Sequence, residues 1–186
     1  MKALLVIDME QGFLATKRPP RNNLQAEKKI QQLLSAFRQK HESIIHIQHV
    51  SLDPSSAFYY PQGYAFMTDF SPLEDELVFQ KHVNSAFIGT DLADYLKKQK
   101  INELILVGLT LPHCVSTTAR MAGNLGFQTT VISDATASYA LQDVNGHWLD
   151  AETIHQCHLA ALNEEFAQIM TTEQFLNYFT SSNNQL

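Results

Sequence analysis

The sequence has few of the residues that mark several common classes of protein. Its 186 residues include two cysteines, Cys114 and Cys157, too few for a disulfide framework and without the spacing of a zinc site. No apolar run approaches the ~20 residues of a membrane span, and the run before Asp8 is too short for a signal-peptide core. Seven Gly and six Pro exclude a collagen-like or linker-dominated chain. We therefore expect a cytoplasmic protein with no membrane partner.

Positive charge is also scarce. Lys and Arg number 13 against 19 Asp and Glu, which gives a net charge of −6 and no basic field to attract phosphate groups. A nucleic-acid partner is therefore not expected. The chain is 45% hydrophobic, so it can bury a sizeable core, and it shows neither a repeat nor a break in composition. We expect a single domain over residues 1–186.

Short apolar or β-branched runs alternate with amphipathic segments along the chain. Strands are predicted over 3–7, 43–50, 77–81, 104–107, 127–133 and 166–170. Helices are predicted over 24–37, after Thr90, over 115–125 and 151–166, and from a capping box at Thr171 onward. Strands that alternate with helices predict a three-layer α/β/α fold of Rossmann-like topology with a mostly parallel central sheet. The tail over 180–186 is polar and expected to fray.

Three reactive residues follow strand-like runs. Asp8 ends the first run, Lys81 ends the third, and Cys114 lies in the turn after the fourth. Parallel strands present their carboxyl ends at one edge of the sheet, so the three side chains should converge there. Each residue also has an ordinary role: a lone Cys is usually a small buried hydrophobe, Asp a turn former and Lys a solvated charge.

Cys114 is also placed at the start of the predicted helix over 115–125. A helix N-terminus and a nearby ammonium both favour the thiolate over the thiol. We therefore expect a lowered pKa for Cys114, with Asp8 as the base that accepts the thiol proton and later passes it to a leaving amine. His113 could form a dyad with Cys114, but adjacent residues point apart, so it is expected to line the pocket instead. Cys157, on the apolar stripe of Ile154, Cys157, Ala161 and Leu162, is expected to be core.

Three segments carry a resemblance to a known family. They begin at Leu4, Lys81 and Val107 and read LLVIDMEQGF, KHVNSAFIGTDL and VGLTLPHCV. In order and spacing they resemble the isochorismatase-like cysteine hydrolases, the superfamily of nicotinamidase and N-carbamoylsarcosine amidase. The resemblance extends to the IMTTE segment that begins at Ile169. It implies the isochorismatase fold, a homo-oligomer and an Asp8, Lys81, Cys114 triad that hydrolyses a small-molecule substrate through a thioester, with no cofactor.

The same resemblance implies a non-proline cis peptide just before the nucleophile. It would fall at Thr110–Leu111 and turn the backbone N–H groups of Leu111 and Cys114 into an oxyanion hole. Pro112 follows directly and makes Leu111–Pro112 a second candidate for the cis bond.

A departure from the family pattern concerns metal binding. Nicotinamidases resemble one another in an Asp-x-His motif with a second His after the second strand, and the corresponding segment here reads HIQHVSLD from His46. His46 and His49 are three apart on a strand and should point to opposite faces, so we expect no metal. Glu152, His155 and His158 have a di-iron spacing, but a solvated helix face is the better interpretation.

The pocket walls are expected from Phe13, Phe87 and His113. The irregular stretch over 51–76 adds a group of aromatic side chains: Phe58, Tyr59, Tyr60, Tyr64 and Phe66. This loop could cap its own site or that of a neighbouring subunit, or its rings could simply pack.

The leading hypothesis is a metal-independent cysteine hydrolase that cleaves a C–N bond of a small amide, ureido or carbamoyl compound. The alternatives are a non-catalytic interaction subunit that kept the fold and a nicotinamidase-type enzyme. Vinyl-ether hydrolysis, as in true isochorismatases, is disfavoured because those enzymes lack the nucleophilic Cys that stands here at Cys114.

Overall fold

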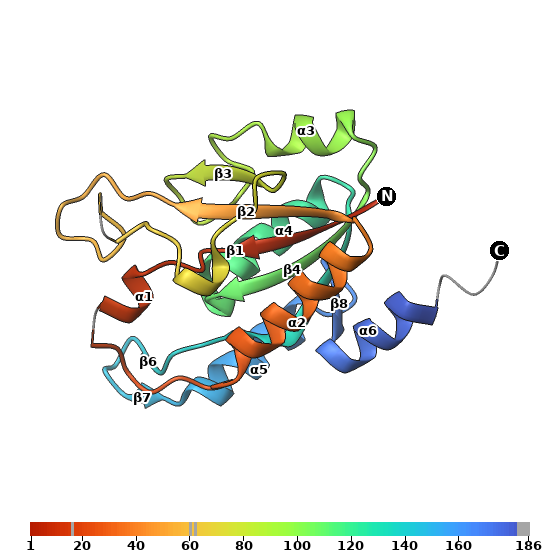
Figure 1. The fold of residues 1–186 in the computed structure, drawn as a ribbon. Helices are drawn as coiled ribbons and strands as arrows, with labels where there is room; N and C mark the ends of the chain where they lie inside the picture. The colour runs from red at the N-terminus through yellow and green to blue at the C-terminus, as the bar shows by residue number, and fades with distance from the viewer. Residues whose placement is uncertain (16, 60, 62, 182–186) are drawn as a thin grey trace.

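The computed structural model describes residues 1–15, 17–59, 61 and 63–181. Its centre is a parallel sheet with the strand order β3-β2-β1-β4-β5-β8 (Figure 1). The strands are β1 (Lys2–Ile7), β2 (Ser43–His49), β3 (Leu77–Lys81), β4 (Glu103–Leu109), β5 (Gln128–Ala137) and β8 (Gln168–Met170). Each neighbouring pair is parallel, as predicted.

Helices cover both faces of this sheet. They are α1 (Gly12–Ala15), α2 (Ala26–Gln39), α3 (Leu92–Lys98), α4 (Ser116–Asn124), α5 (Ala151–Leu162) and α6 (Thr172–Ser181). Apolar residues of α2 and α6 join one buried cluster, and those of α3, α4 and α5 join another on the opposite face. Figure 1 shows α2 in front of the sheet and α4 behind it. The three-layer prediction is confirmed.

Strand β1 is buried on both of its faces, which explains why its sequence is continuously apolar. Leu4 and Val6 belong to the cluster under α2 and α6, whereas Leu5 and Ile7 belong to the cluster under α3, α4 and α5. Side chains alternate between the faces of a strand, so a central strand with both faces covered needs an apolar residue at every position.

The predicted buried face of α5 is confirmed at Leu162 and wrong at Cys157 and Ala161. The buried residues are Ala151, His155, Leu159 and Leu162, while Cys157 is exposed. His155 faces the sheet because its ring bonds Ser138 Oγ at 3.2 Å and the Ser133 carbonyl at 3.1 Å. A buried histidine satisfied by the sheet shifts the inward stripe, which hydropathy alone does not detect. The helix also ends at Leu162 instead of continuing to residue 166.

The ends of the helices follow local chemistry. The capping box at α6 is confirmed: Gln174 Oε1 accepts from the Thr171 N–H at 2.8 Å, and Thr171 Oγ1 accepts from the Gln174 N–H at 3.2 Å. The cap of α3 is Asp91, one residue after the predicted Thr90. The expectation for the tail falls mainly on 182–186, outside the described residues.

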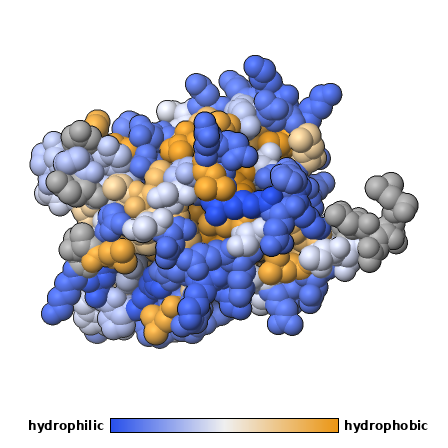
Figure 2. Space-filling model, in the orientation of Figure 1, coloured by the Kyte–Doolittle hydropathy of each residue, from blue (hydrophilic) through white to orange (hydrophobic). Residues whose placement is uncertain are grey.

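The elements that were not predicted are the short helix α1, the 3₁₀ helix η1 (Thr68–Phe70) and the hairpin formed by β6 (Leu141–Gln142) and β7 (Trp148–Leu149). The face in Figure 2 is largely hydrophilic, with hydrophobic side chains visible in separate groups. None of the helices in the described part of the chain has the length and apolar character that a bilayer crossing requires.

Candidate active site

The carboxyl edge of the sheet brings Asp8, Lys81 and Cys114 together. Asp8 follows β1, Lys81 is the last residue of β3, and Cys114 lies in the π-helical turn η2 (Leu111–Val115) between β4 and α4. Lys81 Nζ lies 2.9 Å from Asp8 Oδ2 and 3.3 Å from Cys114 Sγ. The predicted convergence of these three side chains is therefore present.

Both members of the ion pair are removed from solvent. Lys81 is 0% exposed and Asp8 2% exposed. Burial opposes the charge of Lys81, but Asp8 and the Cys114 sulfur outweigh it and raise the Lys81 pKa, so the amine stays an ammonium. Asp8 Oδ1 is buried and has no hydrogen-bond partner in the described part of the chain, which leaves one carboxylate oxygen available to accept a proton.

The expected lowering of the Cys114 pKa is wrong. Burial raises the pKa of this thiol first, and the negative charge of Asp8 adds to the rise, while Lys81 only partly offsets them. Burial also raises the pKa of Asp8, against the opposing charge of Lys81. The contact with the Lys81 ammonium at 2.9 Å opposes this rise and favours a carboxylate at Asp8. The raised pKa of Cys114 favours a neutral thiol at rest, which needs a base to become a nucleophile.

His49 is a site residue that the sequence analysis did not assign. It pairs with Lys81 in the β2–β3 register, and its Nδ1 lies 3.0 Å from Lys81 Nζ. Burial and the Lys81 charge lower the pKa of His49 to about 4, so the ring is neutral and accepts a bond from the ammonium. The predicted strand over 43–50 ends one residue too late, since β2 ends at His49, beside the end of β3 at Lys81.

Glu10 is a second residue that was missed. It is 0% exposed, and its Oε1 accepts the His49 backbone N–H at 2.5 Å. Burial, together with the charge of Asp8, raises the Glu10 pKa to about 10. Glu10 is therefore a neutral acid beside the ion pair and adds no second negative charge there.

A cavity of about 390 Å³ opens onto Cys114. Phe13 and His113 line it, as predicted, and Phe58 is the member of the expected loop aromatics that does so among the described residues. Phe87 does not: its ring stacks on Phe127 at 5.8 Å and packs against the core. Tyr60 lies outside the described residues. Arg18 and Tyr139 also line the cavity and were not predicted.

The turn that carries Cys114 differs from expectation at its cis bond. The cis peptide is Leu109–Thr110, one residue before Thr110–Leu111, and Leu111–Pro112 is not the cis bond. Thr110 is extended, and its carbonyl accepts the N–H groups of His113 and Val115 at 3.2 and 3.3 Å, which closes the turn. Strand β4 runs to Leu109, two residues beyond the predicted end at residue 107, so the residue that leaves the sheet is Thr110. Thr110 Oγ1 also lies 3.0 Å from His113 Nδ1, so His113 bonds away from the sulfur.

The residues near Cys114 do not suit a metal ion. Ligand atoms of Asp8, His49 and Cys114 lie within 4.8 Å of one another. Lys81 Nζ contacts the same three side chains at 2.9 to 3.3 Å, so an ammonium already holds the position that a cation would take. His46 bonds Glu76 at 2.8 Å instead of joining them.

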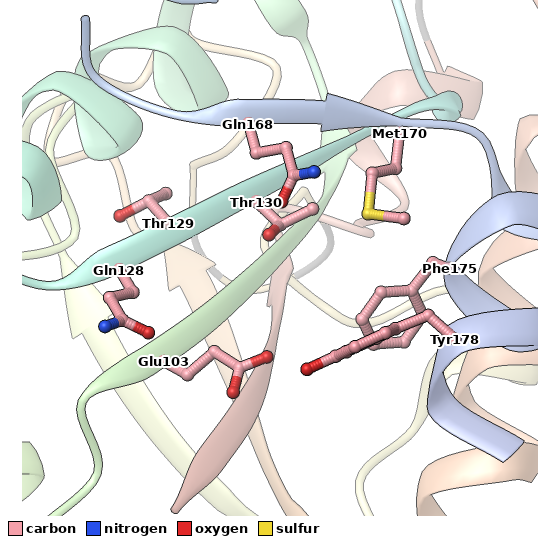
Figure 3. Close-up of a pocket in the computed structure, with 8 residues that line it drawn as sticks. All are labelled: Glu103, Gln128, Thr129, Thr130, Gln168, Met170, Phe175 and Tyr178. Atoms are coloured by element: carbon pink, nitrogen blue, oxygen red, sulfur yellow. The ribbon is translucent and has the colours of Figure 1, made fainter. Parts of the chain in front are cut away.

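A different cavity, of about 420 Å³, lies at the opposite edge of the sheet (Figure 3). Gln128 and Gln168 stand at the starts of β5 and β8, and Phe175 and Tyr178 of α6 face them. Glu103, its charged member, is paired with Lys2 at 3.3 Å. No cysteine thiol lines this cavity among the described residues, and Lys2 neutralises its carboxylate, so the candidate chemistry belongs to the carboxyl edge.

Comparisons with known proteins identify relatives of this chain. Residues 2–174 match the isochorismatase domain. The chain is 46% identical to the isochorismatase family protein YrdC of Bacillus subtilis over 96% of each chain. An isochorismatase-family structure from Chromobacterium violaceum superposes with a TM-score of 0.93 at 35% identity, covering 97% of this chain and 94% of that one. A shorter stretch of 50 residues is 44% identical to Saccharomyces cerevisiae nicotinamidase, covering 27% of this chain and 23% of that protein. The chain belongs to the isochorismatase family of hydrolases.

Proposed function

We propose that this protein is a cysteine hydrolase that cleaves a C–N bond of a small amide, ureido or carbamoyl compound. Cys114 is the nucleophile, Asp8 the proton acceptor and Lys81 the fixed positive charge. The observation that carries the proposal is the position of Lys81 Nζ, in contact with Asp8 at 2.9 Å and Cys114 at 3.3 Å inside a cavity large enough for a small ligand.

Acylation starts from the neutral thiol. Asp8 takes the proton from Cys114 as the sulfur attacks the substrate carbonyl carbon, and the new thiolate character is stabilised by the Lys81 ammonium. The carbonyl π electrons move onto oxygen and return when the C–N bond breaks. Asp8 delivers its proton to the departing nitrogen, so an amine or ammonia leaves and a thioester remains.

Deacylation reverses the proton path. Asp8 takes a proton from water as the hydroxide adds to the thioester, the C–S bond breaks, and the sulfur recovers the proton from Asp8. We place the oxyanion at the turn of Thr110, Leu111 and Cys114, with the N–H groups of Leu111 and Cys114 as donors. Every proton moves between Asp8, Cys114, substrate and water, so the proposal invokes no cofactor.

A nicotinamidase-type activity is a second candidate. The match to nicotinamidase favours it, and the aromatic rings of Phe13 and Phe58 beside the cavity are compatible with a flat ring substrate. The segment from His46 reads HIQHVSLD and lacks the family's Asp-x-His motif, and Lys81 Nζ contacts Asp8 and His49, so these residues do not fit that metal arrangement.

The test is turnover of a panel of small amides and ureido acids, nicotinamide included, read as ammonia release. Cys114→Ser and Cys114→Ala should lower kcat about 1,000-fold or more, because the remaining groups cannot form the thioester. Their thermal midpoints should stay near that of the native protein. Cys157→Ser is the matched control, because Cys157 is a free thiol exposed on α5, and it should keep full activity. Undiminished hydrolysis by Cys114→Ala, or no turnover of any panel member by the native protein, would favour the non-catalytic subunit.

A further inference from the structure

Arg18 is a cation on the wall of the cavity that contains Cys114. Its Nη2 donates to the Gly12 carbonyl at 3.2 Å, and its Nε is buried without a hydrogen-bond partner among the described residues. Within that part of the chain no carboxylate lies within ion-pair distance of its guanidinium. The side chain therefore places donors at the cavity without a protein anion to neutralise them.

Aromatic rings hold this guanidinium in position. Its central carbon lies 4.6 Å from the ring centre of Phe13, 5.4 Å from Tyr139 and 5.7 Å from Phe58. Ring faces attract a cation and restrict its rotation, but they supply no hydrogen-bond acceptor for the N–H groups. The rings therefore orient Arg18 and leave its charge-assisted bonding capacity for another group.

The neighbouring cations differ from Arg18 in this respect. Arg21 makes two bonds to Glu27 at 2.7 and 2.8 Å, and Lys81 is paired with Asp8. His49 is neutral because its pKa is lowered to about 4, and burial also lowers the pKa of His113. Among the described cavity residues, Arg18 is thus the charge that lacks an opposite charge.

We propose that Arg18 binds a carboxylate of the substrate, at the end remote from the C–N bond that Cys114 attacks. This inference rests on the proposed hydrolase function and narrows its substrates to amides or ureido compounds that carry an acid group. A guanidinium matches a carboxylate with two parallel N–H bonds, and such charge-assisted bonds are about twice as strong as bonds between neutral groups. The chain carries a net charge of −6, so an anionic substrate gains no general attraction and needs a local cation such as Arg18.

The first experiment compares acids with neutral analogues of the same size. The native protein should prefer succinamate over butyramide, and 3-ureidopropanoate over propylurea, by about 10- to 100-fold in kcat/KM, the scale of one charge-assisted pair. Arg18→Gln should remove this preference by raising KM for the acids more than KM for the neutral amides. Arg18→Lys keeps the positive charge but lacks the paired N–H groups of a guanidinium, so it should retain part of the preference that Arg18→Gln loses. Equal kcat/KM for acid and neutral members in the native protein would overturn the proposal.

Lys17→Gln is the matched control. Lys17 is the preceding residue, is exposed, and carries the same charge on the same segment. Its replacement should leave the preference for acids unchanged. If Lys17→Gln and Arg18→Gln lowered the preference for acids equally, the preference would come from long-range electrostatic attraction, and direct binding of the carboxylate by Arg18 would be refuted.

A second experiment separates this inference from the hydrolase proposal. Calorimetry with the Cys114→Ala protein, which cannot form the thioester, measures binding of succinamate and 3-ureidopropanoate at low ionic strength. Adding Arg18→Gln to this protein should raise the dissociation constant about 10-fold or more. The thermal midpoints of the two proteins are compared to verify that both are folded. Equal binding by the two proteins overturns the carboxylate site. Arg18-dependent binding without turnover by the native protein supports the carboxylate site and contradicts the hydrolase function.

Discussion

At the scale of single residues, the site is organised by which of its groups hold a charge. One ammonium, Lys81, lies between the carboxylate of Asp8 and the sulfur of Cys114, while His49 is held neutral. Burying a second carboxylate beside Asp8 would be costly, and the raised pKa of Glu10 avoids it by keeping that acid protonated. One negative charge, that of Asp8, then disfavours ionisation of the Cys114 thiol, and the same carboxylate is the base that can accept the thiol proton.

The protonation of Glu10 predicts a pH-dependent stability. Its pKa is raised from 4.5 to about 10 on folding, so the folded protein holds a proton that the unfolded chain releases above pH 4.5. The contribution of Glu10 to folding is therefore fully present below pH 4.5 and is lost as the pH rises toward 10. Glu10→Gln, which cannot ionise, should raise the thermal midpoint above that of the native protein, with a gap that widens between about pH 5 and about pH 9.

The measurement is a series of thermal melts of both proteins across that pH range. Glu10→Ala is the control, because it removes the acceptor of the His49 N–H together with the ionisable group. It should destabilise by about 1–3 kcal/mol below about pH 4.5, and this loss should shrink as the pH rises, since alanine cannot ionise either. Melting curves of Glu10→Gln that run parallel to the native curves would show that Glu10 is ionised in the folded protein.

At the scale of elements, the site depends on how closely β1 and β4 approach each other. Gly108 has φ +122°, and a Cβ there would lie 2.0 Å from the Ile7 carbonyl oxygen. Ile7 directly precedes Asp8, and Gly108 lies two residues before Thr110. The contact between these two strand ends thus sets the spacing between the base and the nucleophile turn.

Gly108→Ala should therefore destabilise the fold by more than about 1 kcal/mol and lower kcat as well, because β1 and β4 must separate where Asp8 begins. Denaturant unfolding and kinetics of the same preparation measure both effects. Gly126→Ala is the matched control: Gly126 has φ +87° but no atom within 4 Å of a built Cβ, so it adds strain without a clash. Equal losses of kcat in the two variants would refute the role assigned to the Gly108 contact.

At the scale of the whole molecule, stability and chemistry are located at opposite edges of the sheet. Phe175 of α6 is 1% exposed and stacks with Phe37 of α2 at 6.0 Å and with Phe179 at 5.4 Å. It lies with the amino ends of the strands (Figure 3), whereas Cys114 lies beyond their carboxyl ends. A change in this aromatic cluster should affect folding without altering the catalytic distances.

Phe175→Ala should lower the free energy of unfolding by about 3–5 kcal/mol, because it leaves a cavity between α2 and α6. The kcat of the folded fraction should stay within about twofold of the native value below the new midpoint, as a denaturant titration with parallel activity measurements would show. Asn177→Ala, at an exposed position of the same helix, should change stability by less than about 0.5 kcal/mol. A proportional loss of kcat in Phe175→Ala would mean that the two edges are coupled.

Much of this architecture followed from patterns that span a few residues. Continuous apolar runs identified β1 and β4 because a strand covered on both faces has no polar position. The capping box at Thr171 placed the start of α6 within one residue, since its two hydrogen bonds are local. The face of α5 that packs on the sheet was not predicted correctly. The ring of His155 is buried because it bonds Ser133 and Ser138, which lie 22 and 17 residues away in the sequence.

The sequence by itself determined the parallel three-layer fold and the meeting of Asp8, Lys81 and Cys114, because strand ends follow from local patterns and parallel strands share one carboxyl edge. The single domain over 1–186, the homo-oligomer and the cytoplasmic location stay predictions. Only the tertiary structure decided the ionisation of the thiol, the neutrality of Glu10, the placement of the cis bond at Leu109–Thr110 and the approach of Arg18 to the cavity. Burial and charge act over distance in space, and residues such as Arg18 and Cys114 become neighbours only after the chain has folded.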